Sequence, residues 1–96
     1  MKLEEEVRKE LKEYLKKAGW FIFQISQKGY RCHKGISDSI AVKNGIVIFL
    51  EAKREVGGKQ SDEQKVFEND IVSHGGNYLC CNSLENLILK IGRLTE

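Results

Sequence analysis

Apolar side chains near the start of the chain recur at intervals of three or four residues. Leu3, Val7 and Leu11 begin this series, which continues for two more turns. Such spacing places one apolar stripe along a helix, so it predicts an amphipathic helix that stops at Gly19. Residues 20–26 are instead rich in aromatic and β-branched side chains, which favour a strand.

The rest of the chain contains further strand and helix patterns. Ser61-Asp62-Glu63-Gln64 is a capping box that opens a helix, and Gly75-Gly76 ends this helix near residue 74. The other predicted elements are a strand pair within 37–53, a strand over 78–81 and a final helix capped by Ser83. The expected order is αβββαβα, which predicts the α/β class.

The strand pair turns at Asn44-Gly45, a dipeptide typical of a two-residue type I′ hairpin turn. This turn pairs Lys43 with Ile46 and determines the register outward from there. Counted along both strands, Asp38 then lies directly opposite Glu51, with both side chains on one face. Two carboxylates with Cβ atoms about 5 Å apart repel each other, so the pair needs a proton or a cation between them.

Lys53 belongs to the same group, because strand side chains repeat every two residues and Glu51 precedes it by two. Residues 46–50 are apolar on both faces of the strand, which predicts a central strand covered on both sides. A charge at the end of such a strand costs free energy unless it is paired or functional. The alternative for Glu51 and Lys53 is a solvated strand end with a weak ion pair.

Glu4 is a third candidate acid at the start of the first helix. On a helical wheel it falls inside the apolar stripe, whereas Glu5 and Glu6 fall outside it. Acidic residues in a first turn are also stabilised by the helix dipole. This ordinary explanation stays open for Glu4.

The chain has 96 residues, a length that predicts one domain over 1–96 with a single core. Its net charge of +2 is too small to indicate nucleic-acid binding by itself. Lys28, Arg31 and Lys34 nevertheless cluster before Asp38 and could contact phosphates. A solvated loop with no such role is the alternative.

Three cysteines without CxxC spacing predict free thiols in an intracellular protein. No segment has the ~18 apolar residues of a membrane span or the pattern of a signal peptide. We therefore expect a cytoplasmic protein without a membrane partner.

The acids and the lysine together suit a phosphodiester substrate. Mg²⁺ or Mn²⁺ would lower the pKa of a water and neutralise charge on the scissile phosphate. Lys53 would orient that water or stabilise the transition state. The candidate metal ligands are Asp38, Glu51, Glu4 and the carbonyl of Ala52. This chemistry predicts hydrolysis of a nucleic-acid backbone.

The segment Gly35-x-Ser37-Asp38, twelve further residues and then Glu51-Ala52-Lys53 resembles the PD-(D/E)xK nuclease superfamily. The compact whole resembles the VRR-NUC branch of that superfamily, and the similarity covers nearly the full chain. Ser37 stands where the family usually has proline. The fold that the resemblance implies is a restriction-endonuclease-like αβββαβ core with a mixed central sheet flanked by helices.

The resemblance also implies roles for individual residues. Glu4, Asp38, Glu51 and Lys53 match the catalytic set of the family, and Ser61 and Gln64 match a motif that opens the next helix. It implies metal-dependent cleavage of DNA, often structure-selective, by a homodimer. Gln64 also has a structural role that is compatible with a role in the site, because the capping box by itself uses this side chain.

Three functions stay open. The first is a Mg²⁺- or Mn²⁺-dependent DNA endonuclease selective for branched or junction DNA. The second is a DNA-binding module on the same frame that does not cut, and the third is an assembly protein.

Trp20, Phe21 and Phe23 are predicted to be core residues rather than base-stacking platforms. His33 and His74 are predicted to be surface residues.

Overall fold

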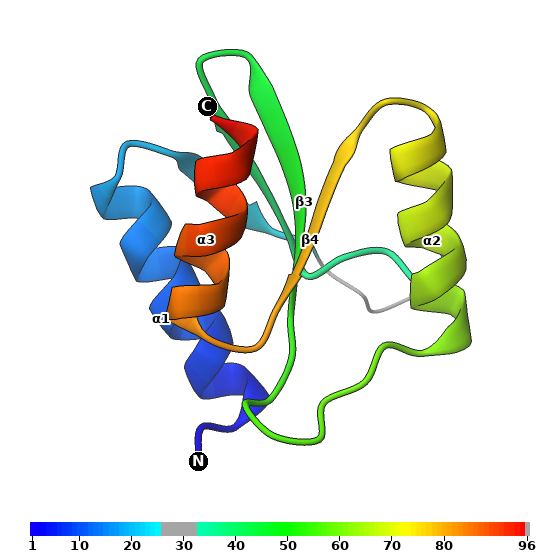
Figure 1. Ribbon diagram of the computed structural model, residues 1–96, viewed down its shortest axis with the longest axis horizontal. Helices are drawn as coiled ribbons and strands as arrows, with labels where there is room; N and C mark the ends of the chain where they lie inside the picture. The colour runs from blue at the N-terminus through cyan, green and yellow to red at the C-terminus, as the bar shows by residue number, and fades with distance from the viewer. Residues whose placement is uncertain (26–32, 96) are drawn as a thin grey trace.

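The computed structural model describes residues 1–25 and 33–95 and has an α/β architecture, with a four-stranded mixed sheet and three helices. The elements are α1 (Glu4–Lys17), β1 (Phe21–Gln24), β2 (Ser39–Lys43), β3 (Ile46–Ala52), α2 (Asp62–Ser73), β4 (Asn77–Cys81) and α3 (Leu84–Leu94). Figure 1 shows α1 and α3 side by side on one side of the sheet and α2 on the other. The predicted order αβββαβα is confirmed.

The first helix buries the predicted apolar stripe. Val7, Leu11 and Leu15 are at most 1% exposed. Leu3 was expected in this stripe but is 66% exposed, because it is the N-cap residue and the helix begins after it. Gly19 follows the helix with φ +91°, a conformation in which a Cβ atom would be strained. The chain can therefore reverse directly into β1.

The sheet has the strand order β1-β2-β3-β4, in which only the β3–β4 pair is parallel. Asn44 and Gly45 have φ values of +50° and +81°, as a type I′ turn requires. Lys43 pairs with Ile46 across this turn, and each further pair of the β2–β3 ladder follows the predicted register. The hairpin prediction is confirmed.

The core lies between the sheet and the layer formed by α1 and α3. β3 directs Ile48 and Leu50 into this core. On the other face of β3, Phe49 packs against Phe67 of α2 with 5.6 Å between ring centroids, while Val47 stays 41% exposed. The prediction of a strand covered on both faces is therefore correct near α2 and wrong near the hairpin turn.

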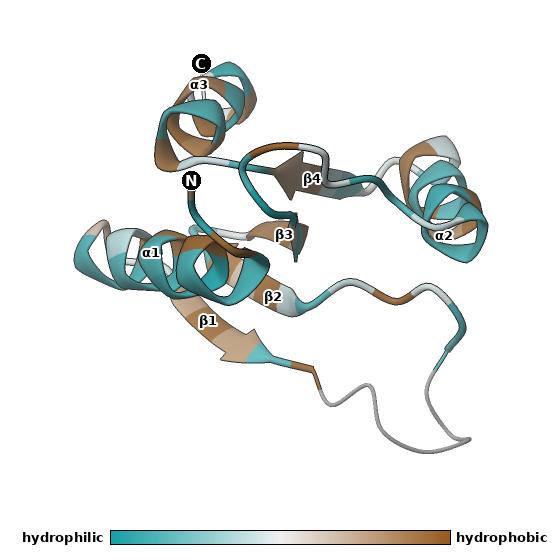
Figure 2. Cartoon of the chain, turned by 90° about the horizontal axis from the view of Figure 1, so that it is seen from below, coloured by the Kyte–Doolittle hydropathy of each residue, from teal (hydrophilic) through white to brown (hydrophobic). Residues whose placement is uncertain are grey.

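Away from α1, one face of β1 and β2 is covered by none of the described helices. Phe21 and Phe23 point to this side and are 66% and 42% exposed, with 5.6 Å between their ring centroids. Their assignment to the core is wrong, whereas Trp20 is buried as predicted. The reason is the position of α2, which packs against β4 at the other edge of the sheet (Figure 2).

Both later helices begin at the predicted caps. The Ser61 hydroxyl accepts from the Gln64 N–H and the Ser83 hydroxyl accepts from the Asn86 N–H, each at 3.1 Å. Each bond satisfies an amide that a helix N-terminus leaves unpaired. In the described part of the chain, no helix has the length and apolar character needed to cross a membrane.

Candidate active site

Two buried carboxylates meet where the β2–β3 hairpin ends. Asp38 and Glu51 are 7% and 1% exposed. The ladder ends with Ser39 opposite Leu50, which places Asp38 one residue further on and opposite Glu51. The Ala52 N–H donates to Asp38 Oδ2 at 2.8 Å and holds this carboxylate against β3. The structure thus brings the two predicted acids together.

Glu51 is in surroundings that disfavour its charge. The pKa of Glu51 is raised to about 8, and burial is the largest cause. A hydrogen bond to Asp38 and the charge of Asp38 also raise this pKa, whereas the charge of Lys53 lowers it. Its Oε1 atom is buried and has no hydrogen-bond partner among the described residues. Without a cation, Glu51 therefore holds a proton at neutral pH. An unpaired carboxylate oxygen beside a second carboxylate is a donor set that suits a hard divalent cation.

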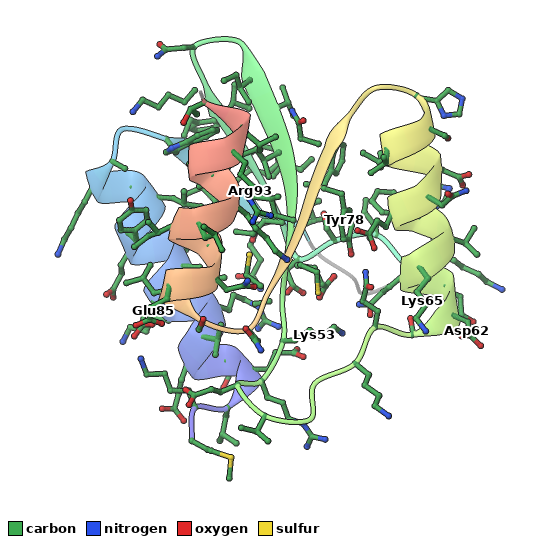
Figure 3. The ribbon with its side chains drawn as sticks, in the orientation of Figure 1. Lys53, Asp62, Lys65, Tyr78, Glu85 and Arg93 are labelled. Carbon is green, nitrogen blue, oxygen red and sulfur yellow. The ribbon has the colours of Figure 1, made fainter. Side chains whose placement is uncertain are left out.

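Lys53 connects the acid pair to α2, and Figure 3 shows it between the strands and this helix. Its Nζ lies 4.0 Å from Glu51 Oε2 and donates to Gln64 Oε1 at 2.8 Å. The lysine side chain is only 13% exposed, which does not fit a solvated strand end. Gln64 Oε1 also accepts from the Ser61 N–H at 2.9 Å, so the capping contact and the contact with Lys53 coexist.

Gly35 brings the segment that carries Asp38 against the start of α2. It has φ +75°, and a Cβ atom added to it would lie 2.1 Å from the carbonyl oxygen of Glu63. Only glycine permits this approach of two backbones. Ser37 is fully buried in the same segment and donates to the Ser39 carbonyl at 3.2 Å. The position of Asp38 is therefore coupled to the first turn of α2.

Arg8 lies at the site but was missed in the sequence. Its Nη2 lies 2.9 Å from Glu4 Oε2 and 3.5 Å from Asp38 Oδ1. Its Nε is buried and lacks a hydrogen-bond partner in the described part of the chain. The Glu4 side chain is 44% exposed and meets the acid pair through this guanidinium. The available signal was the spacing of four residues between Glu4 and Arg8, which places both on one helix face.

The predicted phosphate contacts are described only in part. Lys28 and Arg31 lie outside the described residues, and Lys34 is exposed. Ser61 is exposed at the N-terminus of α2, where the helix dipole favours an anion. Further cations were missed in the sequence, and they line an open cavity of about 420 Å³ formed by Glu5, Glu6, Arg8, Lys9, Lys12 and Gln24.

The third acid stays apart from the pair. Within residues 1–25 and 33–95, no three His, Cys, Asp or Glu side chains form a group that could hold a metal ion. The Arg8 guanidinium contacts both Glu4 and Asp38 and so separates them. Ala52 is buried beside the pair, where its N–H is used by Asp38.

Comparison with known proteins found no family model, no curated protein and no solved structure that matches the chain. The function of the protein is therefore inferred from the geometry and chemistry of this site.

Proposed function

We propose that the protein is a divalent-metal-dependent nuclease that hydrolyses phosphodiester bonds in DNA. The observation that supports this most is the contact between the buried carboxylates of Asp38 and Glu51, with the Lys53 ammonium 4.0 Å from Glu51. A purely structural core gains nothing from this pair, because it must hold a proton or a cation to avoid two like charges out of water. The arrangement is useful where a cation binds and a phosphate approaches.

Mg²⁺ or Mn²⁺ fits the donors that this site offers. Mg²⁺ is commonly bound through one or two carboxylates, with water and substrate phosphate as the remaining ligands, so Asp38 and Glu51 suffice. The buried Glu51 Oε1 has no other partner among the described residues. Glu4 would join them if the Arg8 guanidinium moved aside, and the Ala52 carbonyl is a further proposed ligand.

The chain supplies position and charge to the reaction. A bound cation would lower the pKa of a water and neutralise charge on the scissile phosphate. Lys53 would orient the attacking water or stabilise the charge that develops on the phosphate. Gln64 accepts from Lys53 at 2.8 Å and so determines where the ammonium points. The Ala52 N–H keeps the Asp38 carboxylate facing the site.

Branched or junction DNA is the substrate that we propose. The resemblance to VRR-NUC nucleases and to a restriction-endonuclease-like core supports this choice, as do cations near the acid pair. Contacts between such cations and phosphates position a duplex without reading its sequence. The proposed phosphate-contacting residues are Lys28, Arg31, Lys34 and Ser61, with Lys9 and Lys12 of α1 beside them.

A reducing cytoplasm is the proposed location. Cys80 and Cys81 are free cysteines on β4. Burial raises the pKa of Cys81 to about 11, which keeps this thiol protonated. Free thiols of this kind are typical of intracellular proteins.

A homodimer is the proposed assembly. The sheet has an open face, which is the face of β1 and β2 that none of the described helices covers. On this face Phe21 pairs with Val42, and Val42 pairs with Val47 of β3. Contiguous exposed apolar surface of this kind marks a protein interface, and it offers no charge to a phosphate backbone. We propose a second copy of the chain as the occupant, because two copies would present two active sites to a multi-stranded substrate.

The alternative is a DNA-binding module that does not cut. The Arg8 guanidinium already contacts Glu4 and Asp38, and the described residues contain no group of three metal-ligating side chains. These two observations favour a cluster that works without metal. They leave unexplained the unpaired Glu51 Oε1 beside Lys53.

Cleavage of labelled single-stranded, duplex, flap, fork and four-way-junction DNA with Mg²⁺, Mn²⁺ or EDTA tests the proposal. Asp38→Ala and Lys53→Ala are compared with Lys16→Ala, which removes a lysine from the last turn of α1. Metal-dependent cleavage that both site variants lose and the control keeps supports a nuclease. DNA binding in EDTA with no cleavage under any condition favours the binding module, and no DNA affinity at low salt favours an assembly protein.

A further inference from the structure

A cavity of about 390 Å³ lies between α2 and the sheet, with His33, Phe49, Phe67, Asp70 and His74 among the residues that line it. Its aromatic rings form a continuous set. The Phe67 centroid lies 5.6 Å from that of Phe49 and 5.5 Å from that of His33. Tyr78 of β4, labelled between the strands and α2 in Figure 3, packs against Phe67 with 6.1 Å between ring centroids. The cavity is large enough for a planar ring system.

The cavity and the proposed active site are built on the same two elements, β3 and α2. Phe49 precedes Glu51 by two residues, so both side chains face the same side of β3, roughly 7 Å apart along the strand. On α2, Phe67 follows Gln64 by three residues and lies on the same helix face. Gln64 is the residue that holds Lys53. A DNA strand with a phosphate at Lys53 would therefore place a neighbouring nucleotide at the cavity.

The lining favours a nucleobase over a phosphate. Aromatic faces stack on any base. The Asp70 carboxylate at the rim repels phosphate but accepts hydrogen bonds from the amino groups of bases. His74 Nδ1 lies 2.7 Å from the Asp70 carbonyl oxygen, which can only accept, so Nδ1 donates and the Nε2 of a neutral ring can accept.

We propose that this cavity binds one unpaired nucleobase of the strand that is cut, next to the scissile phosphate. The inference rests on the proposed nuclease function. A base within an intact duplex is stacked and paired, and it cannot enter without being flipped out. The substrate class is therefore DNA with an unpaired nucleotide at the cut, such as a flap, fork or junction, in preference to an intact duplex.

An abasic scan of a cleavable flap or fork tests this inference. One abasic nucleotide is moved position by position along the cut strand, and kcat/KM is measured with Mn²⁺. Loss of stacking should lower kcat/KM roughly 5-fold to 100-fold at a single position beside the cut. If the unmodified DNA is cut but no abasic position lowers kcat/KM, the inference is overturned and the nuclease proposal still stands. No cleavage of any intact substrate overturns both.

Two variants connect the scan to the cavity. His33→Ala removes an exposed ring, and Phe67→Leu keeps an apolar side chain at a buried position. Both should abolish the position-specific sensitivity, whereas Tyr14→Leu, which removes a ring from α1 in the other layer, should retain it. Thermal melting checks that each variant is folded. An abasic profile that stays unchanged in the folded His33→Ala variant overturns the inference even if Phe67→Leu does not fold.

Discussion

The ammonium of Lys53 donates a hydrogen bond to Gln64 Oε1 at 2.8 Å, and this contact ties the end of β3 to the first turn of α2. The same oxygen accepts from the Ser61 N–H at 2.9 Å, which makes it part of the helix cap. One side chain therefore serves both the stability of α2 and the position of the ammonium. Because Lys53 Nζ also lies 4.0 Å from Glu51 Oε2, a change at Gln64 should affect the acid pair.

Gln64→Ala should lower both stability and DNA cleavage. Loss of the Ser61 N–H to Gln64 Oε1 bond of the capping box should cost about 1 kcal/mol of unfolding free energy, while the bond to the Ser61 hydroxyl stays. A misplaced Lys53 should lower kcat on the order of 10-fold to 100-fold. Ser83→Ala is the matched control, because it removes an N-cap bond from α3 and should lose similar stability with no loss of kcat. Urea unfolding and single-turnover cleavage measure the two effects, and equal cleavage by both variants would contradict a site role for Gln64.

Arg8→Gln should strengthen metal binding in the absence of DNA. The Arg8 guanidinium lies 3.5 Å from Asp38 Oδ1 and so competes with an incoming cation for the same carboxylate. Removing about 1 kcal/mol of ion pairing should increase Mn²⁺ affinity roughly fivefold. Isothermal titration calorimetry measures this directly. The exposed Arg93→Gln on α3 loses the same charge and should leave the affinity unchanged, and a weaker affinity in Arg8→Gln would show that Arg8 supports the metal site instead.

Gly35→Ala should destabilise the protein more than Gly45→Ala. Both glycines have positive φ, so each substitution should cost about 1 to 2 kcal/mol of backbone strain. Only at Gly35 would the new Cβ also meet backbone, 2.1 Å from the Glu63 carbonyl oxygen, whereas the space at Gly45 is open to 4 Å. The difference in unfolding free energy isolates this contact. Two equal values would mean that the segment before Asp38 does not pack against α2 in solution.

Short-range signals account for the parts of the fold that the sequence predicts well. Asn44-Gly45 determines the hairpin register within four residues, and the opposition of Asp38 and Glu51 follows from counting outward. The capping box of Ser61 and Gln64 likewise acts within one helical turn. Such features form in the same way whatever packs around them.

The features that sequence analysis missed depend on packing between distant elements. The exposure of Phe21 and Phe23 depends on which edge of the sheet α2 covers. The contact of Arg8 with Asp38 depends on how α1 crosses the end of the hairpin. In the sequence Gly35 resembles an ordinary turn residue, and only the structure shows that the Glu63 backbone lies against it. None of these relationships has a signature within a few residues of sequence.

In EDTA, the stability of the protein should fall as the pH rises from 4.5 to about 8. Burial raises the pKa of Glu51 from 4.5 to about 8, so in this range the folded state holds a proton that the unfolded chain has released. The stabilisation that comes from this bound proton is complete below pH 4.5 and is lost above about pH 8. Because a tenfold change in proton affinity is worth about 1.4 kcal/mol, a pKa raised from 4.5 to about 8 corresponds to a decrease on the order of 5 kcal/mol.

Urea unfolding across that pH range, with Glu51→Gln beside the wild type, measures this effect. The amide cannot titrate, so the variant should lack the decrease, whereas the exposed Glu13→Gln should keep it. Added Mn²⁺ should oppose the trend, because metal ligands bind in their deprotonated form and affinity rises with pH. A wild-type curve in EDTA that matches Glu51→Gln at every pH would show that the Glu51 carboxyl is hydrated in solution.

Phe21→Ser should shift the protein from dimer to monomer. Phe21 is 66% exposed, so its loss should cost the folded monomer little. If the open face of β1 and β2 is buried against a second copy, the dissociation constant should rise roughly tenfold or more, as expected for an aromatic ring at the centre of an interface. Leu89→Ser removes a side chain that is 56% exposed on α3 and should leave the constant unchanged. Sedimentation velocity over a dilution series distinguishes the two variants, and a wild-type protein that is monomeric throughout the series would contradict the homodimer.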